Sequence, residues 1–216
     1  MPQNDSIEKI IDVATFYVDT SFTFVQHFNL NFTLNIMSNT ATKWVLDPVH
    51  SEAQFKIKHL VISTVTGSFN TFAGSMESTE DDNFDNANVE FSLDVDSINT
   101  NQEQRDAHLR GEEFFDAVKF PHIKFESTSF VKTGSNEYHV TGNLTVKDVT
   151  KPATLEAEYG GSAVDFYGNH KAGFEVSGKI NRKEFGLTWG AVTEAGSIVL
   201  GDDVKLIFNV QFVKQA

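Results

Sequence analysis

The chain of 216 residues carries 17 basic and 30 acidic side chains, a formal net charge of -13, and no cysteine. The lack of cysteine excludes disulfides, thiolate nucleophiles and zinc-thiolate sites. The acidic balance argues against a general nucleic-acid binder, which needs a basic surface for phosphates, and gives no electrostatic help in binding an anionic lipid surface. The 20 phenylalanines and only 4 prolines indicate a protein rich in strands.

Residues 1–36 are predicted to be an N-terminal extension outside the core fold, with residues 37–216 forming one domain. The extension begins with acidic residues and lacks the basic region and cleavage pattern of a signal peptide. The alternative is an amphipathic helix over residues 6–18. Because no stretch reaches the roughly 18 apolar residues of a membrane span, stable membrane insertion is not expected. The expected location is the cytoplasm, with the periplasm as the alternative.

From Trp44 onward, apolar and polar residues alternate with the period of two that is typical of half-buried strands. The alternation runs through residues 55–57, 89–95, 123–125, 140–146, 155–159, 174–180 and 204–212. Turn signals occur at residues 133–136, 159–162, 167–169 and 200–203. Many antiparallel strands joined by short turns indicate an all-β fold, either a closed barrel or a sandwich. Phe69 and Phe72 break the alternation between two glycines, which favours the bent strand of a barrel.

Residues 101–110 are predicted to form one short helix between strands. Thr100 and Glu103 have the spacing of a capping box, and Gly111 stands where the helix would end. At about 100° per residue, Asp106 and Arg110 share a face and are expected to form an i, i+4 pair.

The stretch RDAHLRGEEFFD, residues 105–116, concentrates acids, bases and cations and invites a catalytic interpretation. Arg105 and His108 lie on a different face of the helix from the expected pair, so the charged groups do not converge on one point. We interpret the stretch as structural, with Phe114 and Phe115 anchoring the end of the helix to the rim of the barrel.

Other candidate sites are weaker. The histidines lack the short spacing of metal ligands, and His122 and His139 occupy the polar phase of their strands. Ser51 follows His50 without the surroundings of a catalytic nucleophile. Arg182 is expected in a surface ion pair, with an anion contact as the alternative. No metal, cofactor or catalytic residue is therefore predicted.

Four stretches resemble, in the same order, the YceI-like family. They are WVLDPVHSEAQFKIKHLVISTVTGSF (44–69), INTNQEQRDAHLRGEEFFDAVKFPHIKFES (98–127), GNLTVKDVTKPATLEAEY (142–159) and INRKEFGLTWG (180–190). The resemblance runs over residues 44–213. Gly111, Glu113 and Asp148 depart from the residues that the family often has there, without touching the strand pattern. The resemblance implies a lipocalin-like antiparallel β-barrel that binds polyisoprenoids.

The resemblance and the strand pattern together predict that a polyisoprenoid or similar long-chain lipid lies inside the barrel, which would act as a carrier, store or sequestering protein rather than an enzyme. The predicted lining residues are Phe55, Ile57, His59, Phe91, Leu93, Phe125, Leu144, Val146, Phe174, Val176, Leu206 and Phe208. Arg105 and His108 are the expected contacts to a lipid head group. The alternatives are an ordinary packed core in a stress-related structural protein and an enzyme acting on such a lipid. A homodimer through exposed phenylalanines at the rim is a further expectation.

Overall fold

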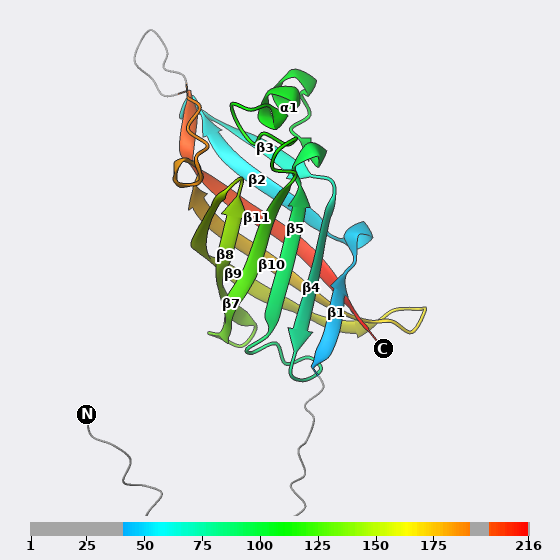
Figure 1. The fold of residues 1–216 in the computed structure, drawn as a ribbon. Helices are drawn as coiled ribbons and strands as arrows, with labels where there is room; N and C mark the ends of the chain where they lie inside the picture. The colour runs from blue at the N-terminus through cyan, green and yellow to red at the C-terminus, as the bar shows by residue number, and fades with distance from the viewer. Residues whose placement is uncertain (1–40, 191–198, 216) are drawn as a thin grey trace, which may run out of the picture. The chain divides into compact units, whose positions relative to one another are not determined.

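The structure is a computed structural model that describes residues 41–190 and 199–215 (Figure 1). The extension predicted over residues 1–36 lies outside these residues. The helix predicted over 101–110 is α1 (Glu103–Arg110). The strands are β1 (Thr42–Leu46), β2 (Glu52–His59), β3 (Ser63–Phe69), β4 (Phe72–Ser78), β5 (Asn88–Asp94), β6 (Ile98–Asn99), β7 (His122–Lys132), β8 (Glu137–Val146), β9 (Val149–Val164), β10 (His170–Asn181) and β11 (Leu200–Lys214).

The strands close into an antiparallel barrel. Three pairs of consecutive strands each act as one bent strand of the barrel, here called a stave. A 3-10 helix at Pro48–His50 separates β1 from β2, and two residues separate β3 from β4. A second 3-10 helix at Val95–Ser97 separates β5 from β6. β2 pairs with residues 200–209 of β11, and β1 pairs with residues 212–214 of the same strand. With each bent pair taken as one stave, the barrel has eight strands. The barrel is therefore confirmed over the sandwich, and the bend expected near Phe69 is present.

Two of the four predicted turns are wrong. Residues 159–162 lie within β9 and residues 200–203 lie within β11. Each stretch instead marks an irregular register, between Gly173 and Phe174 in one case and between Leu200 and Val204 in the other. Gly161 has a φ of 111°, which L side chains rarely adopt, so the glycine permits a bulge there. Glycine therefore allows a long strand to curve at this point without ending it.

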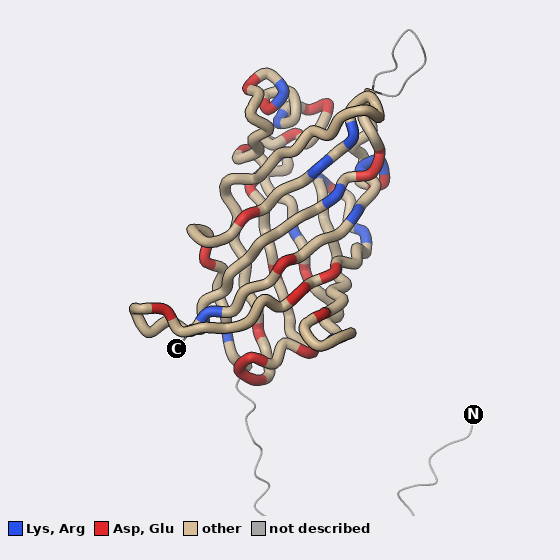
Figure 2. Tube along the Cα trace, turned by 180° about the vertical axis from the view of Figure 1, so that it is seen from behind, with Lys and Arg blue, Asp and Glu red and all other residues tan. Residues whose placement is uncertain are grey.

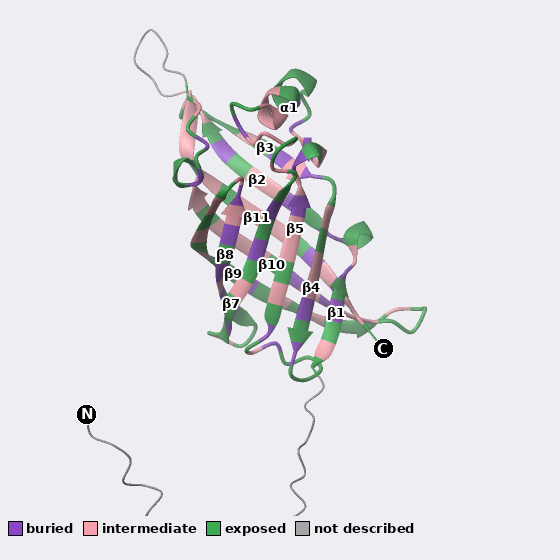
Figure 3. Ribbon diagram, in the orientation of Figure 1, coloured by how far each residue is buried: buried purple, intermediate pink, exposed green. Residues whose placement is uncertain are grey.

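The end of the barrel opposite α1, which Figure 1 shows at the start of β1, is filled by aromatic side chains that contact one another. Phe84, from the connection between β4 and β5, is fully buried, and its ring centroid lies 5.5 Å from that of Trp44 and 5.0 Å from that of Phe174. The Trp44 indole donates a hydrogen bond of 3.0 Å to the Ser78 hydroxyl, which satisfies its one donor. Figure 3 shows buried residues along β7 and β8 separated by more exposed ones, as the alternation predicts. The barrel is thus packed at this end.

The hairpin between β9 and β10 is held by the Asp165 carboxylate. Its oxygens accept hydrogen bonds from the backbone amides of Tyr167 and Asn169, both at 2.9 Å, and from the Asn169 side chain at 3.0 Å. The Asn169 side chain and then its backbone amide are the main causes that lower the pKa of Asp165 to about 2. Because the folded-state pKa lies below the ordinary value of 3.8, the stability from this carboxylate is present above that pH and is lost as the pH falls toward 2.

An Asp165→Asn variant is therefore expected to melt at a lower temperature than the parent protein at neutral pH. The gap should close between pH 3.8 and pH 2, where the parent carboxylate also loses its charge. Thermal melts monitored by circular dichroism across this range test the expectation. A gap of constant size down to pH 2 would show that the charge on Asp165 does not stabilise the hairpin.

Candidate functional site

Helix α1 is fixed by hydrogen bonds that the capping-box prediction did not anticipate. Its N-cap is Gln102, whose side chain accepts from the Arg105 amide, so the predicted box at Thr100 and Glu103 is wrong. Thr100 instead donates to the Asp106 carboxylate from its backbone amide, at 2.8 Å, and from its hydroxyl. The Arg105 guanidinium donates to the Thr100 hydroxyl at 2.7 Å and to its carbonyl at 2.8 Å. These bonds satisfy the buried carboxylate and tie α1 to the end of β6.

The expected pair of Asp106 and Arg110 is also absent. Asp106 is buried toward Thr100, whereas Arg110 donates to the carbonyls of Asp96 at 2.9 Å and Ile98 at 3.2 Å. Both side chains thus bond to groups from the segment before the helix. A surface i, i+4 pair is worth only about 0.3–0.5 kcal/mol, so the buried hydrogen bonds from Thr100 to Asp106 outweigh it.

A cavity of about 480 Å³ lies between α1 and the barrel interior. Its wall is mostly apolar and comes from β2, β3, β5, β7, β8, β10 and β11, with α1 and the segments after α1 and β10 at the mouth. A second apolar cavity of about 90 Å³ adjoins it deeper in the barrel. The two cavities share the side chains Leu93, Ile123, Leu144, Leu206 and Phe208. The apolar interior therefore continues inward from the mouth past these residues.

All of the predicted lining residues lie on the wall of one cavity or the other. The outer cavity contacts Phe55, Ile57, His59, Leu93, Leu144, Val146, Leu206 and Phe208, and the deeper one contacts Phe91, Phe125, Phe174 and Val176 besides the shared residues. Arg105 and His108 line the outer cavity at its mouth. The structure thus brings the predicted residues together around one space. That they contact a ligand stays a prediction.

Arg182 is a mouth residue whose role the sequence interpretation missed. It begins the 3-10 helix Arg182–Phe185 and is 3% exposed, so the expected surface ion pair is wrong. Its guanidinium donates to the carbonyls of Gly201 at 2.8 Å and Trp189 at 2.7 Å, and to that of Leu187. Burial lowers the pKa of Arg182, which Asp202 at 3.5 Å partly offsets. This cation joins the segment after β10 to the start of β11.

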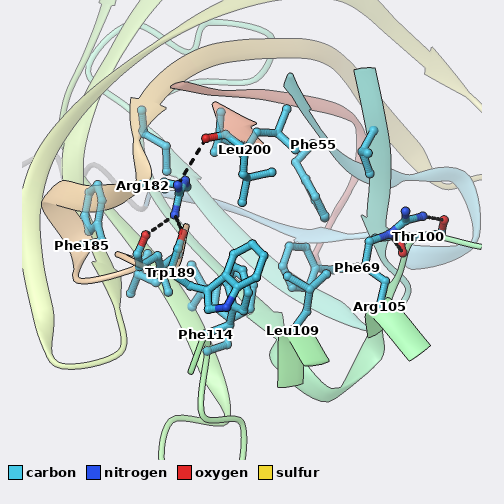
Figure 4. A pocket seen from close by; sticks show the side chains of 18 of the residues that line it. Phe55, Phe69, Thr100, Arg105, Leu109, Phe114, Arg182, Phe185, Trp189 and Leu200 are labelled. Carbon is cyan, nitrogen blue, oxygen red and sulfur yellow. Dashed lines mark hydrogen bonds between the residues drawn. The ribbon is translucent and has the colours of Figure 1, made fainter. Parts of the chain in front are cut away.

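The strand pattern contained a signal for Arg182. Val176 and Ile180 occupy the inward phase of β10, and continuing the same period of two reaches Arg182. Figure 4 shows Arg182 and Arg105 on opposite sides of the pocket, each held by carbonyl or hydroxyl oxygens of the chain. The mouth therefore has a fixed cation on each side.

An aromatic group, also missed, covers the mouth between the two arginines. The rings of His108, Phe114 and Trp189 lie with their centroids 5.0 to 5.2 Å apart. Phe114 is buried and Phe115 packs against Phe69 at 6.2 Å, as expected for residues that anchor the helix end. Spacing along the sequence could not have paired Trp189 with α1, because the contact is made only when the barrel closes.

The remaining candidates stay apart. His122 and His139 are exposed on their strands, and within residues 41–190 and 199–215 no group of three His, Cys, Asp or Glu side chains could hold a metal ion. Ser51 donates to the Asp47 carbonyl and accepts from the Gln211 amide, which joins β1, β2 and β11. None of the helices in the part of the chain that the structure describes has the length and apolar character to cross a membrane.

The model of the YceI-like domain family matches residues 44–212. The chain belongs to the YceI-like family. The family resemblance of the sequence motifs is thereby confirmed. Protein YceI of Salmonella newport (strain SL254) is 41% identical over 167 residues, which cover 77% of this chain and 83% of the relative.

Solved structures share the barrel. The YceI protein of Campylobacter jejuni superposes with a TM-score of 0.63 at 31% identity, covering 74% of this chain and 90% of that one. A polyisoprenoid-binding domain from Saccharophagus degradans superposes with a TM-score of 0.56 at 15% identity, covering 80% and 98%. The predicted lipocalin-like architecture of this YceI-like chain is therefore confirmed.

Proposed function

We propose that this YceI-like protein binds a long apolar lipid of polyisoprenoid type inside the barrel and acts as its carrier, store or sequestering protein. The observation that carries the proposal is the pair of adjoining apolar cavities, of about 480 and 90 Å³, that lead inward from the mouth. Burying apolar surface yields about 0.8 kcal/mol per CH₂, so a dozen methylenes would supply roughly 10 kcal/mol before ordering costs. The shared fold of the Saccharophagus degradans domain, which is described as polyisoprenoid-binding, is consistent with this ligand.

The polar end of the lipid would lie at the mouth, beside Arg105 and His108. The His108 ring is 39% exposed and has one nitrogen 2.8 Å from the Glu113 carboxylate. Arg105 is fixed by its hydrogen bonds to Thr100, which hold its guanidinium at the edge of the cavity and away from the interior. A polar group on the lipid would therefore meet cationic and hydrogen-bonding side chains there.

The environment of the charged groups supports binding rather than catalysis. Asp106 is bonded to Thr100, Arg105 is bonded to the same residue, and Arg182 is bonded to three carbonyls. Side chains held in this way position the walls of the mouth. A polyisoprenoid needs only apolar surface to be retained, which the barrel interior offers.

The test is to purify the full chain, extract it with organic solvent and identify the released compounds by mass spectrometry. We expect lipids whose masses differ by whole isoprene units. A matched Leu93→Trp variant places a larger side chain where the two cavities meet, and should keep its fold while releasing less lipid or shorter lipid. Release of no apolar compound, together with no binding of added polyprenol, would contradict the proposal.

A further inference from the structure

The lysines on the outside of the barrel are concentrated toward the mouth. Lys56 of β2 lies directly opposite Lys205 of β11, which in turn lies opposite Lys179 of β10. All three are exposed, and like charges in direct register destabilise a sheet. Among the described residues, only Lys179 of this lysine row has a carboxylate partner, Asp203 at 2.9 Å. The lysine row therefore destabilises the sheet. It also leaves positive charge that a binding partner could contact.

A glutamate row crosses the same outer face further from the mouth. Glu175 of β10 lies opposite Glu158 of β9, which lies opposite Glu137 of β8. Glu175 and Lys179 are four residues apart, or about 13 Å along the strand. Figure 2 shows basic residues gathered at one end of these strands and acidic residues toward the other end. The net charge of -13 is therefore unevenly distributed, and the mouth has a basic side.

An exposed apolar tip stands beside this basic side. Val61 and Ile62, in the hairpin between β2 and β3, are 74% and 86% exposed. The hairpin joins the edge of the cavity, because the Leu60 amide donates to the Val199 carbonyl at 2.9 Å, and Val199 and His59 line the cavity. The tip is therefore at the mouth.

The backbone of the tip also indicates a use outside the fold. Val61 has a φ of 66°, a left-handed conformation that is unfavourable for a β-branched residue and that glycine or asparagine would adopt at less cost. Val61 is 74% exposed, so the described part of the chain buries little of it. Neither the conformation nor the exposure is explained by the stability of the barrel.

We propose that the mouth of the barrel docks on a lipid bilayer that carries anionic head groups. Val61 and Ile62 enter the interface, while Lys56 and Lys205 approach the head groups together with Lys58, which is also exposed on β2. Charge complementarity selects an anionic surface, and the apolar tip selects a bilayer over a nucleic acid, which would attract the lysines alone. The inference rests on the proposed function in one respect: a docked mouth would let the apolar ligand pass between bilayer and cavity without crossing water.

A second apolar hairpin serves as the control. Phe166 and Tyr167, between β9 and β10, are fully or almost fully exposed. They follow Asp165 at the end of the barrel where the glutamate row lies, and the nearby His170 ring contacts Asp82 at 3.4 Å. Lys171 lies near this hairpin too, but it is paired with Asp47 at 3.0 Å and with Asp165 at 3.5 Å, so it leaves little free positive charge for anionic lipids. An anionic bilayer should therefore bind the tip at Val61 and Ile62 and not the tip at Phe166 and Tyr167, because the charges around the two tips differ.

The experiment is flotation of the full chain with vesicles of phosphatidylcholine alone or of phosphatidylcholine with phosphatidylglycerol, both free of isoprenoid. We expect binding to the anionic vesicles that weakens as salt is added. A Lys56→Gln, Lys205→Gln variant should bind roughly thirty-fold more weakly, because each basic residue near an anionic surface contributes about a factor of five. A Val61→Gly, Ile62→Ser variant should also lose at least about tenfold.

The Val61→Gly change keeps the test independent of folding, because glycine relieves the left-handed residue and should hold or raise the melting temperature while vesicle binding falls. The control Phe166→Ser, Tyr167→Ser should bind vesicles like the parent. Equal binding by the parent and both mouth variants would overturn the inference, as would loss of binding in the control or stronger binding to single-stranded DNA than to anionic vesicles. Because the vesicles contain no isoprenoid, these outcomes are separate from the solvent extraction that tests the proposed function.

Discussion

Replacement of Arg182 by methionine is expected to lower the free energy of unfolding by about 3–5 kcal/mol, although methionine retains much of the apolar volume. The guanidinium donates to the carbonyls of Leu187, Trp189 and Gly201. Without it these acceptors lose their donor, and each buried polar group left unpaired costs about 1–3 kcal/mol. Urea denaturation monitored by tryptophan fluorescence measures the loss. Because Trp189 lies at the mouth, we also expect weaker retention of the proposed lipid.

The adjacent Lys183→Met variant is the matched control. Lys183 also carries a positive charge and contacts Asp202 at 2.9 Å, but its side chain is 47% exposed. Exposed ion pairs contribute at most about 1 kcal/mol, so this variant should unfold close to the parent. A similar loss in both variants would attribute the effect to charge near Asp202. A loss confined to Arg182→Met would attribute it to the buried carbonyls.

The strand phases could be predicted from the sequence because each strand has one face toward the interior. In β5, Phe91 and Leu93 alternate with Ser92 and Asp94, and a shift by one residue would expose the apolar side chains. The closure of the barrel was harder to predict from the sequence, because periodicity does not show which strands are neighbours. The family resemblance supplied that information, and the register of β1 and β2 along β11 explains how the barrel closes.

Apart from the two turns, the errors concern polar groups whose partners belong to another element or segment of the fold. Arg182 was expected at the surface because charged residues usually lie there, yet the fold places the carbonyls of residues 187, 189 and 201 around it. Asp106 was paired by helical spacing with Arg110, whereas the end of β6 offers it two donors from Thr100. Local spacing cannot predict such partners, because they are chosen by the closed barrel.

The charge pattern is a further property that needed the three-dimensional register. From composition, the chain is acidic and has no attraction for an anionic surface. Strand pairing nevertheless aligns Lys56, Lys205 and Lys179 in one row and Glu175, Glu158 and Glu137 in another. Charges further away than the screening length of about 10 Å are largely screened, so a surface in contact with the mouth responds to the nearby lysine row more than to the net charge of the whole molecule.

A Phe91→Asp substitution is expected to abolish lipid retention and to destabilise the barrel by at least about 3–5 kcal/mol. Phe91 lies on the wall of the deeper cavity, with its ring centroid 5.9 Å from that of Phe72 and 5.4 Å from that of Phe208. The substitution removes these contacts and places a carboxylate against an apolar wall that offers no donor. Thermal melting and the extracted lipid per mole of protein measure the two effects.

The matched control is Ser92→Asp, one residue along β5 and on the opposite face. Ser92 lies directly opposite Lys124 of β7, so a carboxylate there faces a cation at the outer surface. This variant should keep both its lipid and its melting temperature. The comparison separates the effect of a negative charge on β5 from the effect of a charge inside the barrel. Equal behaviour of the two variants would mean that the interior face of β5 does not contact the lipid.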